Sequence, residues 1–448
     1  MKNVYPVLNK GIILLVQPKG GLIGEIGAPC EYVNDTAAEI LELCDGTATV
    51  EGISRILAER HDEHFERALN LVSQFLDGAV QKGHIIYSPT PAHVLGTIAG
   101  NREYWVPVDM SVDMTTLCDL KCIHCYAEAG PKERGLSTED LLAVLKKIRA
   151  VGVIKVVLTG GDPPARPDFL EILKFCAQHF LIVDIATNGY RIDGEMAERI
   201  ARMDKIGVIT CRVSIDGKEA IHDAIRGVKG SWRRAVDAVE VLSRHGIPVS
   251  VTMTLNTMNV GDLEDVIIIA KNKGASRFSP GMTLEEGRAR GKNLELTPTQ
   301  KEDVSRRLRE LAPTYSSPTF FVSTWVGISE RDAPSDTESE SESVNCGAGY
   351  RMYSVDCRGN VKPCPAFNYT LGNIVSNEIR NVFTSSVVEF FAQLKWPTKD
   401  RCGNCMNFHI CAECHAAALV KSKEIDTCWW ADQWVSIPDG FENPIKSK

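Results

Sequence analysis

Three cysteines lie close together in the loop 115–126, spaced as C-x3-C-x2-C at Cys118, Cys122 and Cys125. This spacing is too short for three separate core positions, but it suits one loop wrapped around an inorganic cluster. Cysteine thiolates are the usual ligands of a [4Fe–4S] cluster. Three protein ligands would leave one of its four irons open to a small molecule. A zinc loop, or chance in a cysteine-rich chain, is the alternative explanation.

A second group of cysteines lies in the C-terminal part of the chain, at Cys346, Cys357, Cys364, Cys402, Cys405, Cys411, Cys414 and Cys428. Two of its spacings are C-x2-C, which zinc ribbons also use. The 15 cysteines do not predict a disulfide framework, because we find no secretion signal and expect a reducing, cytoplasmic location. The four scattered cysteines are expected to be small buried apolar residues: Cys30, Cys44, Cys176 and Cys211.

The elements that must position the first cysteine loop alternate between strands and helices from residue 104 to about 313. Strand-like runs span 106–114, 154–159, 181–187, 208–215, 249–255 and 276–280, with amphipathic helices such as 137–150 and 167–178 between them. This alternation predicts an α/β fold with a parallel sheet covered by helices. Six units suit a partial (βα)6 TIM barrel, in which chemistry lies at the carboxyl ends of the strands.

Polar turns follow several of these strands. The second strand ends in Gly160, Gly161 and Asp162, where glycines allow close approach of the backbone to a ligand. The fourth strand ends at Ser214, and Arg226 follows twelve residues later. A guanidinium suits a carboxylate, because two N–H groups can meet two oxygens. Without further context, the glycines would form an ordinary turn and Arg226 would be a surface residue.

The cysteine loop resembles the cluster loop of radical S-adenosylmethionine (SAM) enzymes, and the turn at residues 160–163 resembles their Gly-Gly-Glu-Pro motif, with Asp162 replacing the glutamate. The resemblance implies a [4Fe–4S] cluster on the three cysteines, with SAM chelating the open iron. An electron from a donor such as flavodoxin or ferredoxin would then release a 5′-deoxyadenosyl radical. By the same resemblance the contacts to SAM would come from His124, Gly160, Gly161, Asp162, Ser214 and Arg226. The alternative interpretation of His124 is a solvated histidine in the loop that does not contact SAM.

The C-terminal cysteines resemble the SPASM domain of peptide maturases, which usually holds two auxiliary iron–sulfur clusters. By position, one or two auxiliary [4Fe–4S] clusters would be bound, the first by Cys346, Cys364 and Cys414, the second by Cys402, Cys405, Cys411 and Cys428. The spacing from Cys411 to Cys414 is similar to that of subtilosin-type thioether maturases. A cysteine often found upstream of Cys346 is absent, so the first cluster would have an open iron or use Cys357. Pro365 stands where sulfatase maturases carry an aspartate base, which argues against formylglycine formation.

Residues 1–88 predict a small α+β unit with strands at 11–16 and 22–26, helices at 36–44, 50–60 and 64–81, and a closing strand at 84–87. The order resembles a winged helix-turn-helix, and residues 34–46 resemble the peptide chaperone of pyrroloquinoline quinone biosynthesis. Such domains bind the leader of a ribosomally made precursor peptide by strand addition. One alternative is that this unit only packs as a structural domain and binds no peptide. DNA binding is disfavoured, because this segment has twelve acidic residues and only seven basic ones, and the whole chain has a net charge of −8.

The sequence therefore predicts a leader-recognition domain at 1–88, a linker at 89–103, a radical SAM partial barrel at 104–313, a linker at 314–344 with an acidic tract at 334–343, a SPASM domain at 345–437 and a tail at 438–448. No run of about 18 apolar residues predicts a membrane span, and no nucleic-acid partner is expected.

The predicted function is modification of a precursor peptide, with a cysteine sulfur joined to a peptide carbon in a thioether. A carbon–carbon link, or tailoring of a cofactor such as a tetrapyrrole, is the alternative within the same superfamily. A non-catalytic metal-binding regulator is the alternative from a different class. The sequence assigns no catalytic base.

Overall fold

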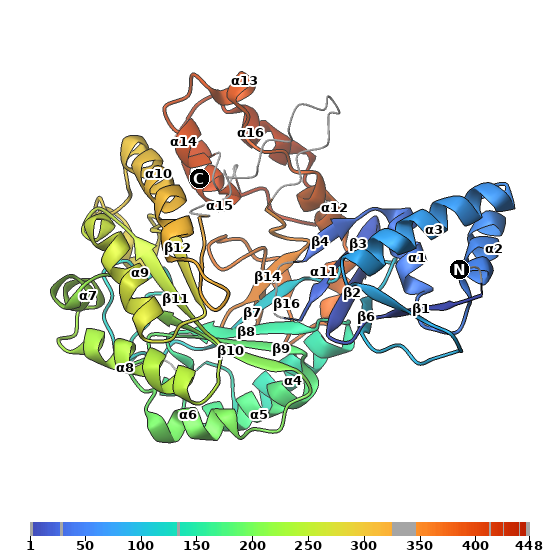
Figure 1. Cartoon of the computed structure of the whole chain (residues 1–448). Coiled ribbons are helices and arrows are strands. Elements are labelled where there is room, and N and C mark those ends of the chain that lie inside the picture. Colours follow the sequence, from blue (N-terminus) through green and yellow to red (C-terminus); the bar gives the residue numbers. More distant parts are fainter. Residues whose placement is uncertain are drawn as a thin grey trace. The chain divides into compact units, whose positions relative to one another are not determined.

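The computed structural model describes residues 3–26, 30–131, 135–324, 346–411, 414–423, 425–438 and 440–444. The predicted acidic tract at 334–343 lies outside these described residues. The chain forms two compact units: the first is Met1–Val108 with Ala150–Ile154, and the second is Asp109–Arg149 with Lys155–Lys448 (Figure 1).

The first unit is a small α+β structure, as the sequence predicts. Its elements are β1 (Tyr5–Leu8), β2 (Ile12–Gln17), β3 (Gly20–Glu25), β4 (Glu31–Val33), α1 (Asp35–Glu42), α2 (Val50–Arg60), α3 (Phe65–Gln81), β5 (Ile85–Ser88) and β6 (Thr97–Gly100). One sheet has the order β4-β3-β2-β6, and β1 pairs with β5 in another. Strand β6 lies inside the segment predicted as a linker, where it pairs in parallel with β2.

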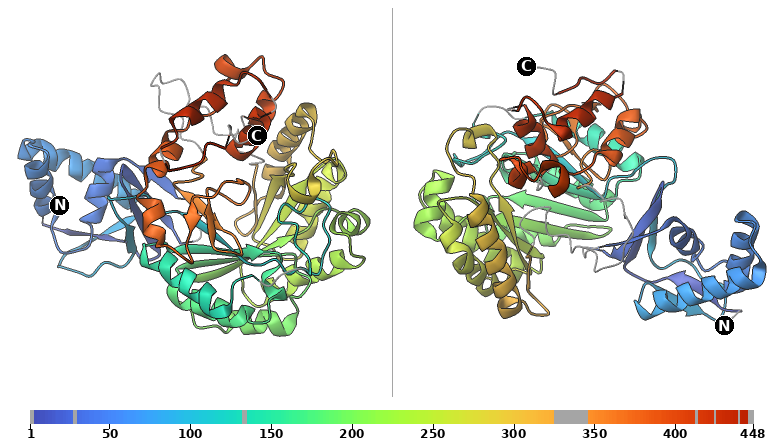
Figure 2. Two further views of the ribbon diagram at one scale, coloured as in Figure 1. Left: turned by 180° about the vertical axis from the view of Figure 1, so that it is seen from behind. Right: turned by 90° about the horizontal axis from the view of Figure 1, so that it is seen from above.

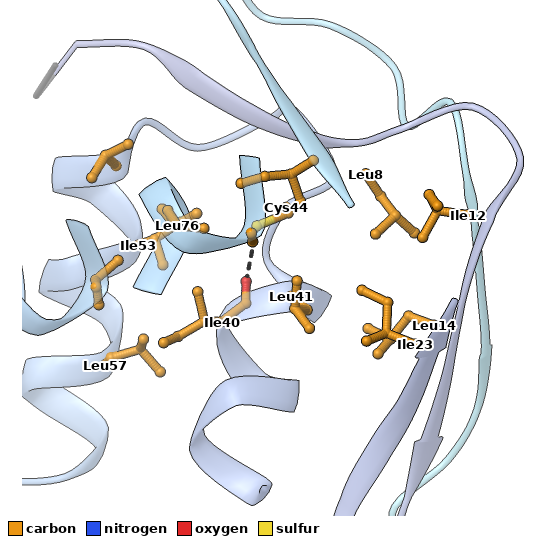
Figure 3. Packing of buried hydrophobic residues seen from close by; sticks show 14 of the residues in the cluster. Leu8, Ile12, Leu14, Ile23, Ile40, Leu41, Cys44, Ile53, Leu57 and Leu76 are labelled. Carbon is orange, nitrogen blue, oxygen red and sulfur yellow. Dashed lines mark hydrogen bonds between the residues drawn. The ribbon is translucent and has the colours of Figure 1, made fainter. Parts of the chain in front are cut away.

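Apolar side chains from the sheet and all three helices form the core of this unit (Figure 3). Leu14 from β2, Ile53 from α2 and Leu76 from α3 are fully buried. Cys44 is also buried, and its thiol donates a hydrogen bond to the carbonyl oxygen of Ile40. It therefore acts as a small apolar residue, as predicted.

Among the other scattered cysteines, Cys176 and Cys211 are buried as expected, whereas Cys30 is exposed. The prediction for Cys30 was wrong because the residue directly precedes β4, a three-residue strand at the edge of its sheet. An edge strand has one side open to solvent, so a neighbouring cysteine need not be covered.

The second unit is built on one continuous sheet. Its strands are β7 (Asp109–Thr115), β8 (Lys155–Gly160), β9 (Ile182–Thr187), β10 (Val208–Ser214), β11 (Val249–Leu255), β12 (Arg277–Met282), β13 (Phe321–Val322), β14 (Met352–Val355), β15 (Asn360–Lys362) and β16 (Gly372–Asn373). The sheet order is β13-β12-β11-β10-β9-β8-β7-β14-β15-β16. Strands β7 to β12 match the six predicted strands, and they pair in parallel.

Helices follow these strands along the outer side of the sheet (Figures 1 and 2). They are α4 (Thr138–Ala150), α5 (Phe169–His179), α6 (Gly194–Ala201), α7 (Glu219–Arg226), α8 (Ser231–Arg244), α9 (Leu263–Asn272) and α10 (Pro298–Tyr315). Strands β7, β10 and β11 alternate in burial along most of their length, and in β11 every second residue is buried. Because successive side chains point to opposite faces, one face packs on the helices while the other lines the barrel. The predicted α/β partial barrel is confirmed.

The C-terminal region joins this sheet, which the sequence did not predict. Strand β14 pairs in parallel with β7, with Val355 opposite Val112, and β15 and β16 continue antiparallel. The remaining helices are α11 (Ile379–Phe383), α12 (Ser386–Gln393), α13 (Lys399–Cys402), α14 (Phe408–Cys411), α15 (His415–Ser422) and α16 (Trp429–Asp432). The buried rings of Phe391 on α12 and Trp430 on α16 each lie against the buried ring of Trp434. In the described part of the chain, no helix has the length and apolar character that a membrane crossing requires.

Candidate active site

A cavity of about 360 Å³ lies at the carboxyl ends of the central strands. The three clustered cysteines line it, together with five residues predicted to contact SAM: His124, Gly160, Gly161, Ser214 and Arg226. The sixth, Asp162, is fully buried and does not line this cavity. The parallel strands β7 to β12 help to bring these residues together, because their carboxyl ends lie at the same edge of the sheet.

The cysteine loop is anchored by its own backbone. The amides of Lys121 and Ile123 donate to the carbonyls of Arg226 and Ile225, each at 2.9 Å, which fixes the loop against the end of α7. The guanidinium of Arg288 donates to the carbonyl of Cys122 at 2.8 Å. The loop therefore holds its thiols in place through contacts that do not use the sulfurs.

The thiols themselves lie in a setting that suits a bound cluster. Burial raises the pKa of Cys118 to about 12, although the amide of Leu120 opposes this, and the neighbouring Cys122 and Cys125 contribute to the rise. A buried thiolate therefore requires a compensating cation, which the iron of a cluster supplies. Asn188 also directs its side-chain amide at the Cys118 sulfur, at 3.5 Å.

The glycine turn after β8 touches the cysteine loop directly. The amide of Gly161 donates to the carbonyl of Thr115 at 2.7 Å, and the amide of Asp162 donates to that of Leu117 at 2.8 Å. A Cβ atom on Gly161 would lie 2.1 Å from the Leu117 oxygen, so only glycine fits. This close approach places the turn beside the cluster loop.

Asp162 connects two strands of the barrel. Its Oδ1 accepts hydrogen bonds from the hydroxyl of Thr187 at 2.6 Å and from the amide of Asn188 at 3.0 Å. Its Oδ2 is buried without a hydrogen-bond partner in the described part of the chain. Burial raises the pKa of this carboxyl to about 6, against the effect of those two hydrogen bonds. The side chain thus joins the ends of β8 and β9.

Arg226 belongs to a buried ionic network. Its Nε lies 2.6 Å from Oδ2 of Asp216, and both side chains are at least nine-tenths buried. The guanidinium also lies 3.7 Å from the sulfur of Cys122, and His124 lies 3.7 Å from the same Asp216 oxygen. Burial alone would raise the pKa of Asp216, but the charge of Arg226 holds it below its ordinary value.

Sequence reasoning gave Asp216 no role. The available signal was its position directly after the fourth strand, where a charged residue reaches the barrel interior.

A second cavity, of about 420 Å³, adjoins the first. The two share the lining residues Tyr126, Gly160, Pro365 and Ala366. The barrel contributes Asp113 to its wall, and the C-terminal region contributes Asp356 and Cys357, among others. Space for a second molecule therefore lies directly beside the cysteine-lined cavity.

The C-terminal cysteines fall into two groups. Besides burial, the neighbours that raise the pKa of Cys364 are Cys414 and Cys346. For Cys411, burial and the neighbours Cys428, Cys405 and Cys402 raise the pKa to about 12. The structure therefore brings together the same two sets that the sequence assigned to two clusters, while Cys357 lines the second cavity. Their roles as ligands remain a prediction.

Within the described ranges, no three His, Cys, Asp or Glu side chains converge on one metal position. In a [4Fe–4S] cluster each thiolate binds a different iron, so its ligands need not meet at one point.

Three regions of the chain match known families. Residues 112–268 match the Radical SAM superfamily, residues 31–85 match coenzyme PQQ synthesis protein D (PqqD), and residues 346–406 match the SPASM iron–sulfur cluster-binding domain. Because radical SAM and SPASM domains carry SAM and [4Fe–4S] clusters, these are the cofactors of this chain.

Relatives resemble the chain over most of its length. The antilisterial bacteriocin subtilosin biosynthesis protein AlbA of Bacillus subtilis is 26% identical over 96% of this chain and 97% of its own. The sporulation killing factor maturation protein SkfB of the same species is 29% identical over 65% of this chain and 67% of its own. Streptococcus suis SuiB bound to S-adenosylmethionine has the same fold, with a TM-score of 0.65 and 16% identity over 93% of this chain and 96% of its own. The chain is thus an enzyme of the radical SAM superfamily that also carries a PqqD domain and a SPASM domain.

Proposed function

We propose that this enzyme modifies a ribosomally made precursor peptide by joining a cysteine sulfur to a peptide carbon. The observation that carries the proposal is the cavity of about 420 Å³ that opens beside the cysteine-lined cavity. It offers space for a peptide residue next to the place where hydrogen abstraction would occur. The similarity to AlbA, which includes the first unit, also supports this function.

The cofactors would be held by the residues of the first cavity. Cys118, Cys122 and Cys125 would bind the cluster, and the glycine turn with Ser214 and Arg226 would bind SAM. When bound, cluster and SAM supply the abstraction of a hydrogen atom from an unactivated carbon. The protein orients the reactants and keeps water out. Asp162 would act indirectly in this scheme, by holding the turn after β8 against the end of β9.

The leader of the peptide would bind to the first unit. Strand β4 is an edge strand, so its outer backbone groups are open to a further strand. Tyr32 at its centre is half exposed and offers an apolar contact to the incoming strand. Lys82, the residue after α3, lies 2.9 Å from Glu31 at one end of this edge.

Incubation of the anaerobically reconstituted enzyme with SAM, reductant and a candidate precursor peptide tests the proposal. We expect peptide-dependent release of 5′-deoxyadenosine and a product that has lost two hydrogen atoms. In that product the joined cysteine resists alkylation by iodoacetamide. A product with the same mass but an alkylatable thiol would instead indicate a carbon–carbon link. Zinc in place of iron, with SAM left intact, would indicate the regulatory alternative.

The electron donor is tested in the same assay. We propose flavodoxin or ferredoxin, and either protein in reduced form should replace the chemical reductant.

A further inference from the structure

Two carboxylates from distant parts of the chain meet in the second cavity. Strand β7 pairs in parallel with β14, and this ladder ends with Val112 opposite Val355. Asp113 and Asp356 each follow by one residue, so they lie at the same edge of the sheet, and both line the cavity. The two side chains are close enough for the negative charge of Asp356 to raise the pKa of Asp113.

The backbone of β7 is irregular at this point. Its pairing with β8 shifts in register between Asp113 and Thr115, as at a β-bulge or similar irregularity. Bulges re-aim side chains near functional sites. Oδ1 of Asp113 is shielded from solvent and has no hydrogen-bond partner among the described residues. An unpaired buried carboxyl oxygen in a cavity wall is costly unless a bound group donates to it.

Asp356 differs from Asp113 in this respect. Its Oδ1 accepts hydrogen bonds from the amides of Arg358 and Asn360, and its Oδ2 accepts one from the Asn360 side chain. Lys362 lies 4.0 Å from the same Oδ2. Both carboxylate oxygens of Asp356 therefore accept hydrogen bonds within its own turn. Asp113 is the carboxylate with an oxygen available to a ligand.

We propose that Asp113 accepts the proton of the cysteine thiol of the bound peptide, an inference that rests on the proposed function. In this step the S–H bond breaks, its electron pair stays on sulfur, and the proton forms an O–H bond on Asp113. The step needs no oxidant. The resulting thiolate is the nucleophilic and metal-binding form of cysteine, and Lys362 and Arg290 in the cavity wall offer it positive charge.

The electrostatics of the cavity support this role. Burial, and then the charge of Asp356, raise the pKa of Asp113 to about 7, while Lys362 opposes the rise. The other ionisable groups in the wall are Tyr126, Glu128, Glu286, Arg290 and Cys357. Proton acceptors work best with a pKa near the working pH. Asp113 is protonated below pH 7 and cannot accept a proton there, so thioether formation should rise as the pH increases through 7.

The test compares two products of the holoenzyme: 5′-deoxyadenosine and thioether. In Asp113→Asn we expect thioether formation to fall by about 10²-fold or more, while peptide affinity and 5′-deoxyadenosine release stay near wild type. Asp113→Glu should restore part of the thioether yield. Asp109→Asn is the matched control, because Asp109 starts the same strand and pairs with Lys155 at the opposite end. It should keep both products.

A second readout does not depend on turnover. In infrared spectra of the aspartate-labelled holoenzyme, we expect a protonated carboxyl band that disappears near pH 7 and is absent in Asp113→Asn. The inference is overturned if Asp113→Asn forms thioether like wild type, or if no such band titrates. If the wild-type enzyme releases 5′-deoxyadenosine but forms no thioether from any peptide, the proposed function falls and this inference with it.

Discussion

The buried pair of Arg226 and Asp216 gives a sharp test of how the active site is held together. Their side chains meet at 2.6 Å, Asp216 is fully buried, and Arg226 is 9% exposed. Removing one partner of such a pair leaves an uncompensated charge in a medium of low dielectric, which costs about 3–5 kcal/mol. We expect this loss in the free energy of unfolding for Arg226→Gln, and a similar one for Asp216→Asn.

The double variant should lose much less than the sum of the two single losses. Once both charges are gone, neither group carries the cost of unpaired burial, so the cycle should give a coupling of about 2 kcal/mol or more. Urea unfolding of the anaerobic protein, followed by tryptophan fluorescence, measures each variant. Affinity for SAM should fall in Arg226→Gln, because the guanidinium lines the cysteine-lined cavity.

Arg212→Gln is the control for this cycle. Arg212 lies on β10 like Ser214, and it pairs with Asp184 on β9, but 38% of its side chain is exposed. Solvent screens such a pair, so its removal should cost no more than about 1 kcal/mol. If the losses from Arg226→Gln and Asp216→Asn add to within about 0.5 kcal/mol, or match that of Arg212→Gln, the reasoning about this pair is refuted.

Four further variants probe other parts of the molecule. Gly161→Ala should destabilise the protein by about 2–3 kcal/mol in urea unfolding and lower its iron content, because the added Cβ meets the carbonyl of Leu117 at 2.1 Å; unchanged iron would contradict this. Cys364→Ser should lose about one cluster of iron by colorimetric assay, whereas Cys357→Ser, whose thiol lines the second cavity, should keep wild-type iron. Leu76→Ala should cost about 2–5 kcal/mol by thermal or urea unfolding, because Leu76 is fully buried in the first unit; a loss below 1 kcal/mol would show that this core readily collapses around the gap.

Much of the barrel could be predicted from local sequence. The six central strands are short apolar runs that end in polar turns, and the structure places each within a few residues of its expected position. The three clustered cysteines could be predicted equally well, because one loop contributes all three and their spacing is a local property of the sequence. The position of Asp162 was harder to foresee. Its motif indicates a contact to SAM, but its carboxylate bonds to Thr187 and Asn188, a choice that depends on how β8 packs against β9.

The meeting of Asp113 and Asp356 could not be predicted, since it depends on β14 pairing with β7 across more than two hundred residues of chain. The local sequence does not indicate that register. Strand β14 has only four residues, and the most prominent sequence pattern in its region is the spacing of the cysteines. One signal was nevertheless present. Strands of a parallel barrel usually read as continuous apolar runs, yet β7 carries Asp109, Ser111 and Asp113 at every second position. Such alternation means that one face of the strand borders a polar space, and at its carboxyl end that space is the cavity where we expect the peptide thiol to lose its proton.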